Sequence, residues 1–112
     1  MKRVLILSIV VALVAASSPV AAADASANNR HLIYIYPHSG GFSLKYDGAN
    51  ESTNVACEPN RSILPIGAPN YQAIVSTLIT AFAGSYLVDV VFDDTTRGSC
   101  EMTINRVLVK KQ

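Results

Sequence analysis

One segment of helical periodicity lies among segments that alternate polar and apolar residues, and this order constrains the fold most strongly. The spacing predicts a helix over about 70–83, because apolar residues recur every three or four positions. Asn70 is a favourable N-cap, and Gly84 is typical of a helix C-terminus. The apolar stripe consists of Tyr71, Ile74, Val75, Leu78 and Phe82.

The segments around this helix favour strands, because they are rich in β-branched and aromatic residues or alternate in polarity. Residues 24–30 are small and polar, and we expect them to be a frayed lead-in. Residues 61–66 are predicted to be extended, with Pro65 keeping them out of a central strand. The predicted strands are 31–36, 42–46, 52–58, 85–92 and 99–109.

The N-terminus has the pattern of a secretory signal peptide. Lys2 and Arg3 precede an uncharged apolar run, 4–16, and small residues follow up to Ala23. The run is too short for a transmembrane helix, which needs about 20 residues, and no second apolar span follows. The sequence therefore predicts a signal peptide at 1–23 and a single exported domain at 24–112, periplasmic or secreted, with no membrane span.

The two cysteines, Cys57 and Cys100, predict one disulfide, because export would place them in an oxidising compartment. The bond would close a loop of about 44 residues and stabilise the fold by roughly 3.5–4 kcal/mol. A metal site is disfavoured because it needs three or four ligands, and His31 and His38 are the only histidines.

Charge is nearly balanced in residues 24–112, with seven basic and eight acidic side chains. The basic residues are dispersed, which argues against nucleic acid as a partner. Residues 62–88, including the whole predicted helix, carry no charge. This stretch is either a Ser/Thr-faced surface of a small secreted protein or a helix face covered by another subunit.

The order strand, strand, strand, helix, strand, strand predicts a mainly β protein with one helix. It is the order of the OB-fold, a five-stranded Greek-key barrel, with the helix between strands three and four. The third and fifth strands are neighbours in that fold. A Cys57–Cys100 bond would then join adjacent strands, at the short Cα separation that a disulfide requires.

Several short segments within roughly residues 31–109 together carry a resemblance to known proteins. They are Phe42-Ser43-Leu44-Lys45, Val55-Ala56-Cys57, Asn70-Tyr71-Gln72-Ala73, Gly84, Tyr86-Leu87-Val88-Asp89-Val90 and Cys100. These segments resemble small exported bacterial proteins related to the binding (B) subunits of subtilase-cytotoxin and pertussis-like A–B toxins. The resemblance implies an OB-fold, glycan or glycoprotein binding, possible assembly into a pentamer and a possible catalytic A subunit as partner.

An OB-fold binds its ligands on one sheet face and on two loops, which here would be 37–41 and 93–98. Sugars are held by aromatic faces and a few fixed polar groups. Tyr34, Tyr36 or Tyr46 could supply the aromatic faces. The predicted ligand-binding residues are Tyr36, His38, Tyr46, Asp93, Asp94 and Arg97.

An enzyme is disfavoured. His38 and Ser39 are adjacent and Asp47 is near in sequence, but neighbouring turn residues rarely adopt triad geometry. Asp93-Asp94 is better explained as a solvated turn than as a calcium ligand. We therefore expect a non-catalytic glycan-binding protein without cofactor or metal. One alternative is a monomeric protein-binding module that acts as an inhibitor or accessory subunit. A small hydrolase is a third, less favoured candidate.

Overall fold

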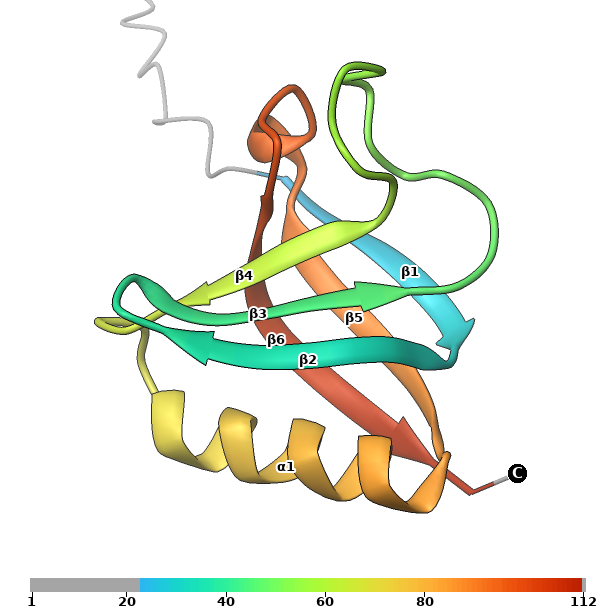
Figure 1. Cartoon of the computed structure of the whole chain (residues 1–112), viewed down its shortest axis with the longest axis vertical. Coiled ribbons are helices and arrows are strands. Elements are labelled where there is room, and N and C mark those ends of the chain that lie inside the picture. Colours follow the sequence, from blue (N-terminus) through green and yellow to red (C-terminus); the bar gives the residue numbers. More distant parts are fainter. Residues whose placement is uncertain (1–22, 112) are drawn as a thin grey trace, which may run out of the picture.

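The computed structural model describes residues 23–111 of the chain (Figure 1). The predicted signal peptide, 1–23, lies outside the described residues except for Ala23. The described part is mainly β with one α-helix, which confirms the predicted class. Its elements are β1 (Asp24–Arg30), β2 (Leu32–His38), β3 (Gly41–Tyr46), β4 (Arg61–Pro65), α1 (Tyr71–Gly84), β5 (Leu87–Asp93), the short 3₁₀ helix η1 (Asp94–Thr96) and β6 (Met102–Lys110).

All six strands belong to one sheet in the order β1-β5-β6-β4-β3-β2, in which only β4 and β6 pair in parallel. The predicted five-stranded barrel is therefore wrong in its strand number. The strands β1 and β2 form the two edges of the sheet, so hydrogen bonds do not close it into a barrel. Only His31 separates these edge strands along the chain, and the chain turns sharply between them (Figure 1).

The additional strand is β1, in the segment that we expected to be a frayed lead-in. Its Ala27 lies opposite Val90 of β5 and is fully buried. Alanine and asparagine have a low preference for strands. The pairing with β5 therefore determines the structure of this segment, and its local sequence does not reveal it.

Residues 47–60 form a loop, so the strand predicted at 52–58 is wrong. The side-chain oxygens of Asn50 and Asn54 accept hydrogen bonds from backbone N–H groups two residues further on. Such local bonds hold the backbone in turns and compete with a strand ladder. The strand that replaces it is β4, in the middle of the sheet. Pro65 does not exclude this position, because it is the last residue of the strand.

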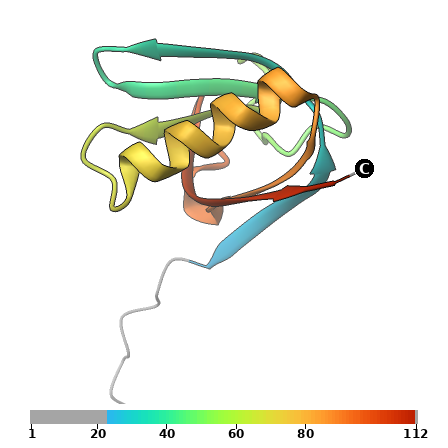
Figure 2. The same ribbon diagram turned by 90° about the horizontal axis from the view of Figure 1, so that it is seen from below.

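The helix α1 lies between the β2–β3 side and the β6 side of the curved sheet (Figure 2). Leu78 and Ala81 are its buried residues. Phe82, which was predicted to be part of the apolar stripe, is 42% exposed. The core that the helix covers consists of Ala27, Phe42, Leu44, Tyr46, Leu64, Leu78, Ala81, Val88, Val90, Phe92, Met102 and Ile104.

Both predicted helix caps differ from the structure. Asn70 occupies the N-cap position, but its backbone is left-handed and its side chain makes no capping hydrogen bond. At the other end the left-handed residue is Ser85, and Gly84 is the last helical residue. A Cβ atom at Gly84 would lie 2.5 Å from Cε2 of the exposed Tyr86, so a larger residue there would require the Tyr86 ring to shift.

The predicted disulfide between Cys57 and Cys100 is confirmed, with 5.1 Å between the Cα atoms. It joins the loops that precede β4 and β6, and not the strands themselves, because neither cysteine lies in a strand. These two strands are parallel neighbours. The disulfide therefore fixes the entry points of two adjacent central strands.

Candidate functional site

Polar and aromatic side chains gather on the outward face of β2, β3 and β4. In β3, Phe42, Leu44 and Tyr46 point into the core, so the alternating residues Ser43 and Lys45 point outward. The strand register places Tyr36 opposite Ser43, and Lys45 opposite both Tyr34 and Arg61. We call this surface the polar face; it consists of Tyr34, Tyr36, His38, Ser43, Lys45, Glu58, Arg61 and Glu101.

Three rings follow one another along β2. The ring centroids of Tyr34 and Tyr36 are 5.9 Å apart, and those of Tyr36 and His38 are 5.2 Å apart, with the planes tilted in both pairs. The guanidinium of Arg61 lies 5.6 Å from the centroid of Tyr36 and also donates a hydrogen bond to its hydroxyl. The rings are therefore held in place from the side of the neighbouring strands.

Glu58 links the first ring to β3. Its carboxylate accepts hydrogen bonds from the Tyr34 hydroxyl at 2.7 Å and from Nζ of Lys45 at 3.2 Å. These two bonds lower the pKa of Glu58. Partial burial and the hydrogen bond to Glu58 raise the pKa of Tyr34 to about 12. At neutral pH the pair is therefore a carboxylate and a neutral phenol.

A second carboxylate, that of Glu101, ends a chain of hydrogen bonds. The backbone N–H of Gly40 donates to Nδ1 of His38 at 3.2 Å, so the proton of the neutral imidazole is on Nε2. Nε2 lies 2.7 Å from Oγ of Ser43, and this hydroxyl donates to Glu101 at 2.7 Å. Nε of Arg61 lies 3.6 Å from the same carboxylate.

The direction of these hydrogen bonds does not suit a serine nucleophile. A catalytic histidine accepts the serine proton. In this structure His38 donates to Ser43, whose own proton points to Glu101. Ser43 is also fully buried. The arrangement orients side chains, and the Ser43 proton is directed to Glu101 and away from the imidazole.

The structure unites two of the predicted ligand residues, Tyr36 and His38, and separates the others. Tyr46 is fully buried in the core. Asp93 accepts hydrogen bonds from Thr95 at the start of η1, and Asp94 pairs with Arg97. The loop that holds these two aspartates lies at the top of Figure 1, away from the β2–β3 turn.

Most of the polar face was not predicted as a site. Tyr34 was considered as an aromatic face but was not included among the predicted ligand-binding residues. The other residues that the prediction missed are Ser43, Lys45, Glu58, Arg61 and Glu101. The alternation in 42–46 was sufficient to place Ser43 and Lys45 on the outward side. The predicted disulfide implied that Glu58 and Glu101 lie near each other, but the strand order that brings them beside β2 and β3 could not be derived from the sequence.

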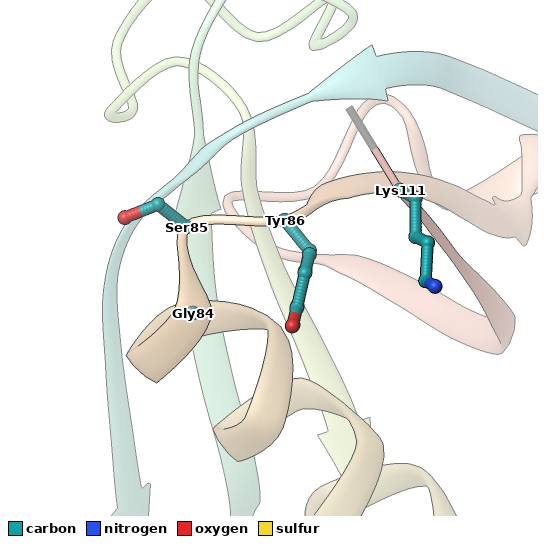
Figure 3. A pocket seen from close by; sticks show the side chains of 4 residues that line it. All are labelled: Gly84, Ser85, Tyr86 and Lys111. Atoms are coloured by element: carbon teal, nitrogen blue, oxygen red, sulfur yellow. The ribbon is translucent and has the colours of Figure 1, made fainter.

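A surface hollow lies elsewhere, at the end of α1, and is lined by Gly84, Ser85, Tyr86 and Lys111 (Figure 3). It shares no residue with the polar face and contains one charged side chain. Within residues 23–111, three or more histidine, cysteine or acidic side chains do not gather at any point where they could hold a metal ion. In the same range, no helix has the length and apolar character needed to cross a bilayer.

No family model matches the chain, and the searches of curated proteins and of solved structures likewise found no match. The polar face therefore has to be interpreted from its own chemistry.

Proposed function

We propose that the protein is an exported, non-catalytic binding protein that recognises glycans on the polar face. The observation that carries this proposal is the row of Tyr34, Tyr36 and His38 rings beside hydrogen-bonding groups that are already held in position. Sugar C–H groups stack on aromatic faces, and sugar hydroxyls bond to oriented donors and acceptors. Preformed contacts also reduce the ordering cost of binding.

The charges of the polar face favour a ligand without a large net charge. Lys45 lies 3.2 Å from Glu58, and Arg61 lies 3.6 Å from Glu101. Each cation thus has a carboxylate beside it, which disfavours a phosphate backbone as the ligand. Glycan hydroxyls can bond to both members of each pair.

The strand arrangement supports a relation to the OB-fold, although the sheet has six strands. We propose that β1 and β2 together take the place of the first OB-fold strand, bent near Asn29, whose φ is 56°. The elements β3, β4, α1, β5 and β6 then follow the OB-fold order. On this assignment the polar face includes the surface of strands two and three, where OB-folds bind oligosaccharides.

Glycan-array screening of the purified protein, followed by calorimetry with the best ligand, tests the proposal. We expect Tyr36→Ala to weaken binding at least about tenfold, since losing one stacked ring costs about 1.4 kcal/mol. Tyr86→Ala is the matched control, because Tyr86 is an exposed tyrosine at the end of α1, outside the polar face. Absence of binding across the array, or equal losses in the two variants, would overturn the proposal.

A second candidate is a protein-binding module, and the uncharged helix favours it. Ile79 and Phe82 of α1 are 48% and 42% exposed and lie within the stretch 62–88, which has no charge. Such a face can meet a second copy or a toxin-like partner subunit without burying a charge. Light scattering of the wild type and of Ile79→Lys tests self-association. A monomeric wild type would exclude the homo-oligomer and leave the monomeric protein-binding module, an inhibitor or accessory subunit, as the form of this candidate.

A further inference from the structure

Both carboxylates of the polar face come directly after the bridging cysteines. Glu58 follows Cys57, and Glu101 follows Cys100. The disulfide brings the two cysteine Cα atoms to 5.1 Å. One covalent bond therefore sets the positions at which both acidic side chains leave the backbone.

Each glutamate holds a different part of the polar face. Glu58 accepts the hydrogen bonds of Tyr34 and Lys45. Glu101 accepts the hydrogen bond of Ser43, to which His38 is bonded, and lies beside Arg61. Moving both glutamates would leave the rings of β2 without the carboxylates that orient the groups around them.

The disulfide stands apart from the core. Cys100 is exposed and Cys57 is half-buried, and the fully packed residues of the sheet and α1 do not include either cysteine. The two loops that it joins are otherwise linked by hydrogen bonds from Thr53 to Arg97 at 3.1 Å and from Asn54 to Gly98 at 3.2 Å. Water competes for such loop hydrogen bonds, so the covalent bond is the firm connection between these loops.

We propose that the Cys57–Cys100 disulfide is a positioning device for the polar face, so that its reduction weakens ligand binding while the sheet and α1 stay folded. This inference rests on the proposed function and extends it to regulation by the redox state. The two cysteines are positioning residues, because they act through Glu58 and Glu101 and do not themselves contact the ligand.

The reductant is a dithiol. One of its thiolates attacks the exposed Cys100 sulfur, the S–S bond breaks, and Cys57 leaves as a thiolate. The second thiol of the reductant then displaces Cys100 and closes a cyclic disulfide. Two electrons pass from the dithiol to the protein, and the two dithiol protons end on the cysteine thiols.

The titration of Tyr34 reports the position of Glu58 without any ligand. In the oxidised protein burial and the Glu58 hydrogen bond hold the pKa of this phenol at about 12. We expect the Cys57→Ser, Cys100→Ser double variant to show a lower pKa, moved toward the ordinary value of 10.0. NMR of ¹³C-labelled tyrosine measures the shift, with Tyr34→Phe to assign the signal and circular dichroism to follow the fold.

A pair of insertions keeps the test decisive if the double variant unfolds. One glycine inserted between Cys57 and Glu58 keeps the disulfide but separates it from the carboxylate, and should lower the Tyr34 pKa. One glycine inserted between Val55 and Ala56 lengthens the same loop on the other side of Cys57. This insertion should leave the Tyr34 pKa unchanged. Val55 is 93% exposed, so the inserted glycine displaces no packed side chain; it alters only the turn in which Asn54 accepts hydrogen bonds from the N–H groups of Ala56 and Cys57, on the side of Cys57 away from Glu58.

The outcomes separate this inference from the proposed function. A glycan that binds the oxidised protein should bind the reduced, folded protein at least about tenfold more weakly, and a change smaller than twofold overturns the inference. A Tyr34 pKa that stays at about 12 in the Cys57–Glu58 insertion variant also overturns it. If no glycan binds the oxidised protein, the proposed function fails, and the Tyr34 titration still decides whether the disulfide positions the polar face.

Discussion

Among the single residues of the described part, Asp89 is a buried charge that holds the bend between the two edge strands. Its side chain is nearly inaccessible and accepts hydrogen bonds from the backbone N–H of Asn29 and from Nζ of Lys110, both at 2.8 Å. Lys110 also donates to the side chain of Asn29. Since Asn29 has a left-handed backbone, this cluster fixes the place where the chain passes from one edge of the sheet to the other.

The hydrogen bond from Lys110, together with that from Asn29, lowers the pKa of Asp89 below its ordinary value of 3.8. A depressed pKa in the folded state stabilises the protein above the unfolded pKa, and this contribution is lost as the pH falls through the folded pKa. We expect Asp89→Asn to reduce the free energy of unfolding by about 1–3 kcal/mol at pH 7. The difference from wild type should shrink on acidification below 3.8, as measured by urea unfolding across this range.

Asp94→Asn serves as the control for Asp89, because Asp94 is exposed and pairs only across its own loop with Arg97. We expect it to change stability by less than about 1 kcal/mol at any pH. An Asp89→Asn effect that is the same at pH 7 and at acidic pH would show that the charge of Asp89 has no part in stability.

At the level of elements, β1 is an integral strand and not a terminal extension. Replacing its fully buried Ala27 by Asp should destabilise the protein by about 3 kcal/mol or more, because the site offers neither space nor a partner for the charge. Asn28→Asp is the neighbouring control, since Asn28 is exposed. Urea unfolding measures both variants, and equal stability of the two would mean that β1 contributes nothing to the core.

The elements that could be predicted are those whose own side chains favour them. The aromatic and β-branched residues of β2, the alternation of β3 and the spacing of α1 all indicated the observed structure. Strand β1 could not be predicted, because its alanines become strand residues only by pairing with β5. In 52–58 the polarity pattern indicated a strand, but the side chains of Asn50 and Asn54 bond to the backbone and hold turns there.

The residues of the polar face could likewise be predicted together only where one segment of the sequence contains them. Tyr36 ends the strand predicted at 31–36 and His38 follows in the predicted loop 37–41, so one short segment was sufficient to suggest them together; in the structure both lie in β2. Glu58, Arg61 and Glu101 come from separate segments and meet only through the sheet order and the disulfide. Tyr46 was chosen for its chemistry alone, whereas the alternation of β3 directs it into the core.

For the whole molecule, the distribution of charge separates two surfaces. The α1 side has no charged residue from 62 to 88, whereas the polar face combines two cations with two carboxylates. Neither surface presents an unbalanced field of one sign, and residues 24–112 have a net charge of only −1. This distribution fits the proposed function, in which the ligand is recognised by stacking and short-range hydrogen bonds.

This balance predicts a weak salt dependence of ligand binding. A protein that neutralises several phosphates loses affinity steeply as salt rises, with a slope of about −0.9 per phosphate contact in a plot of log K against log salt. We expect a slope near zero for glycan binding by this protein, measured by calorimetry at low and high sodium chloride, and no binding of a labelled DNA oligonucleotide at physiological salt.

The variant Glu101→Gln is the informative comparison, because it removes the carboxylate beside Arg61. The guanidinium of Arg61 then becomes available to anions, and a salt-dependent affinity for DNA should appear or increase. A steep slope for the wild type would mean that Lys45 and Arg61 act as free cations, and would argue against a glycan as the ligand.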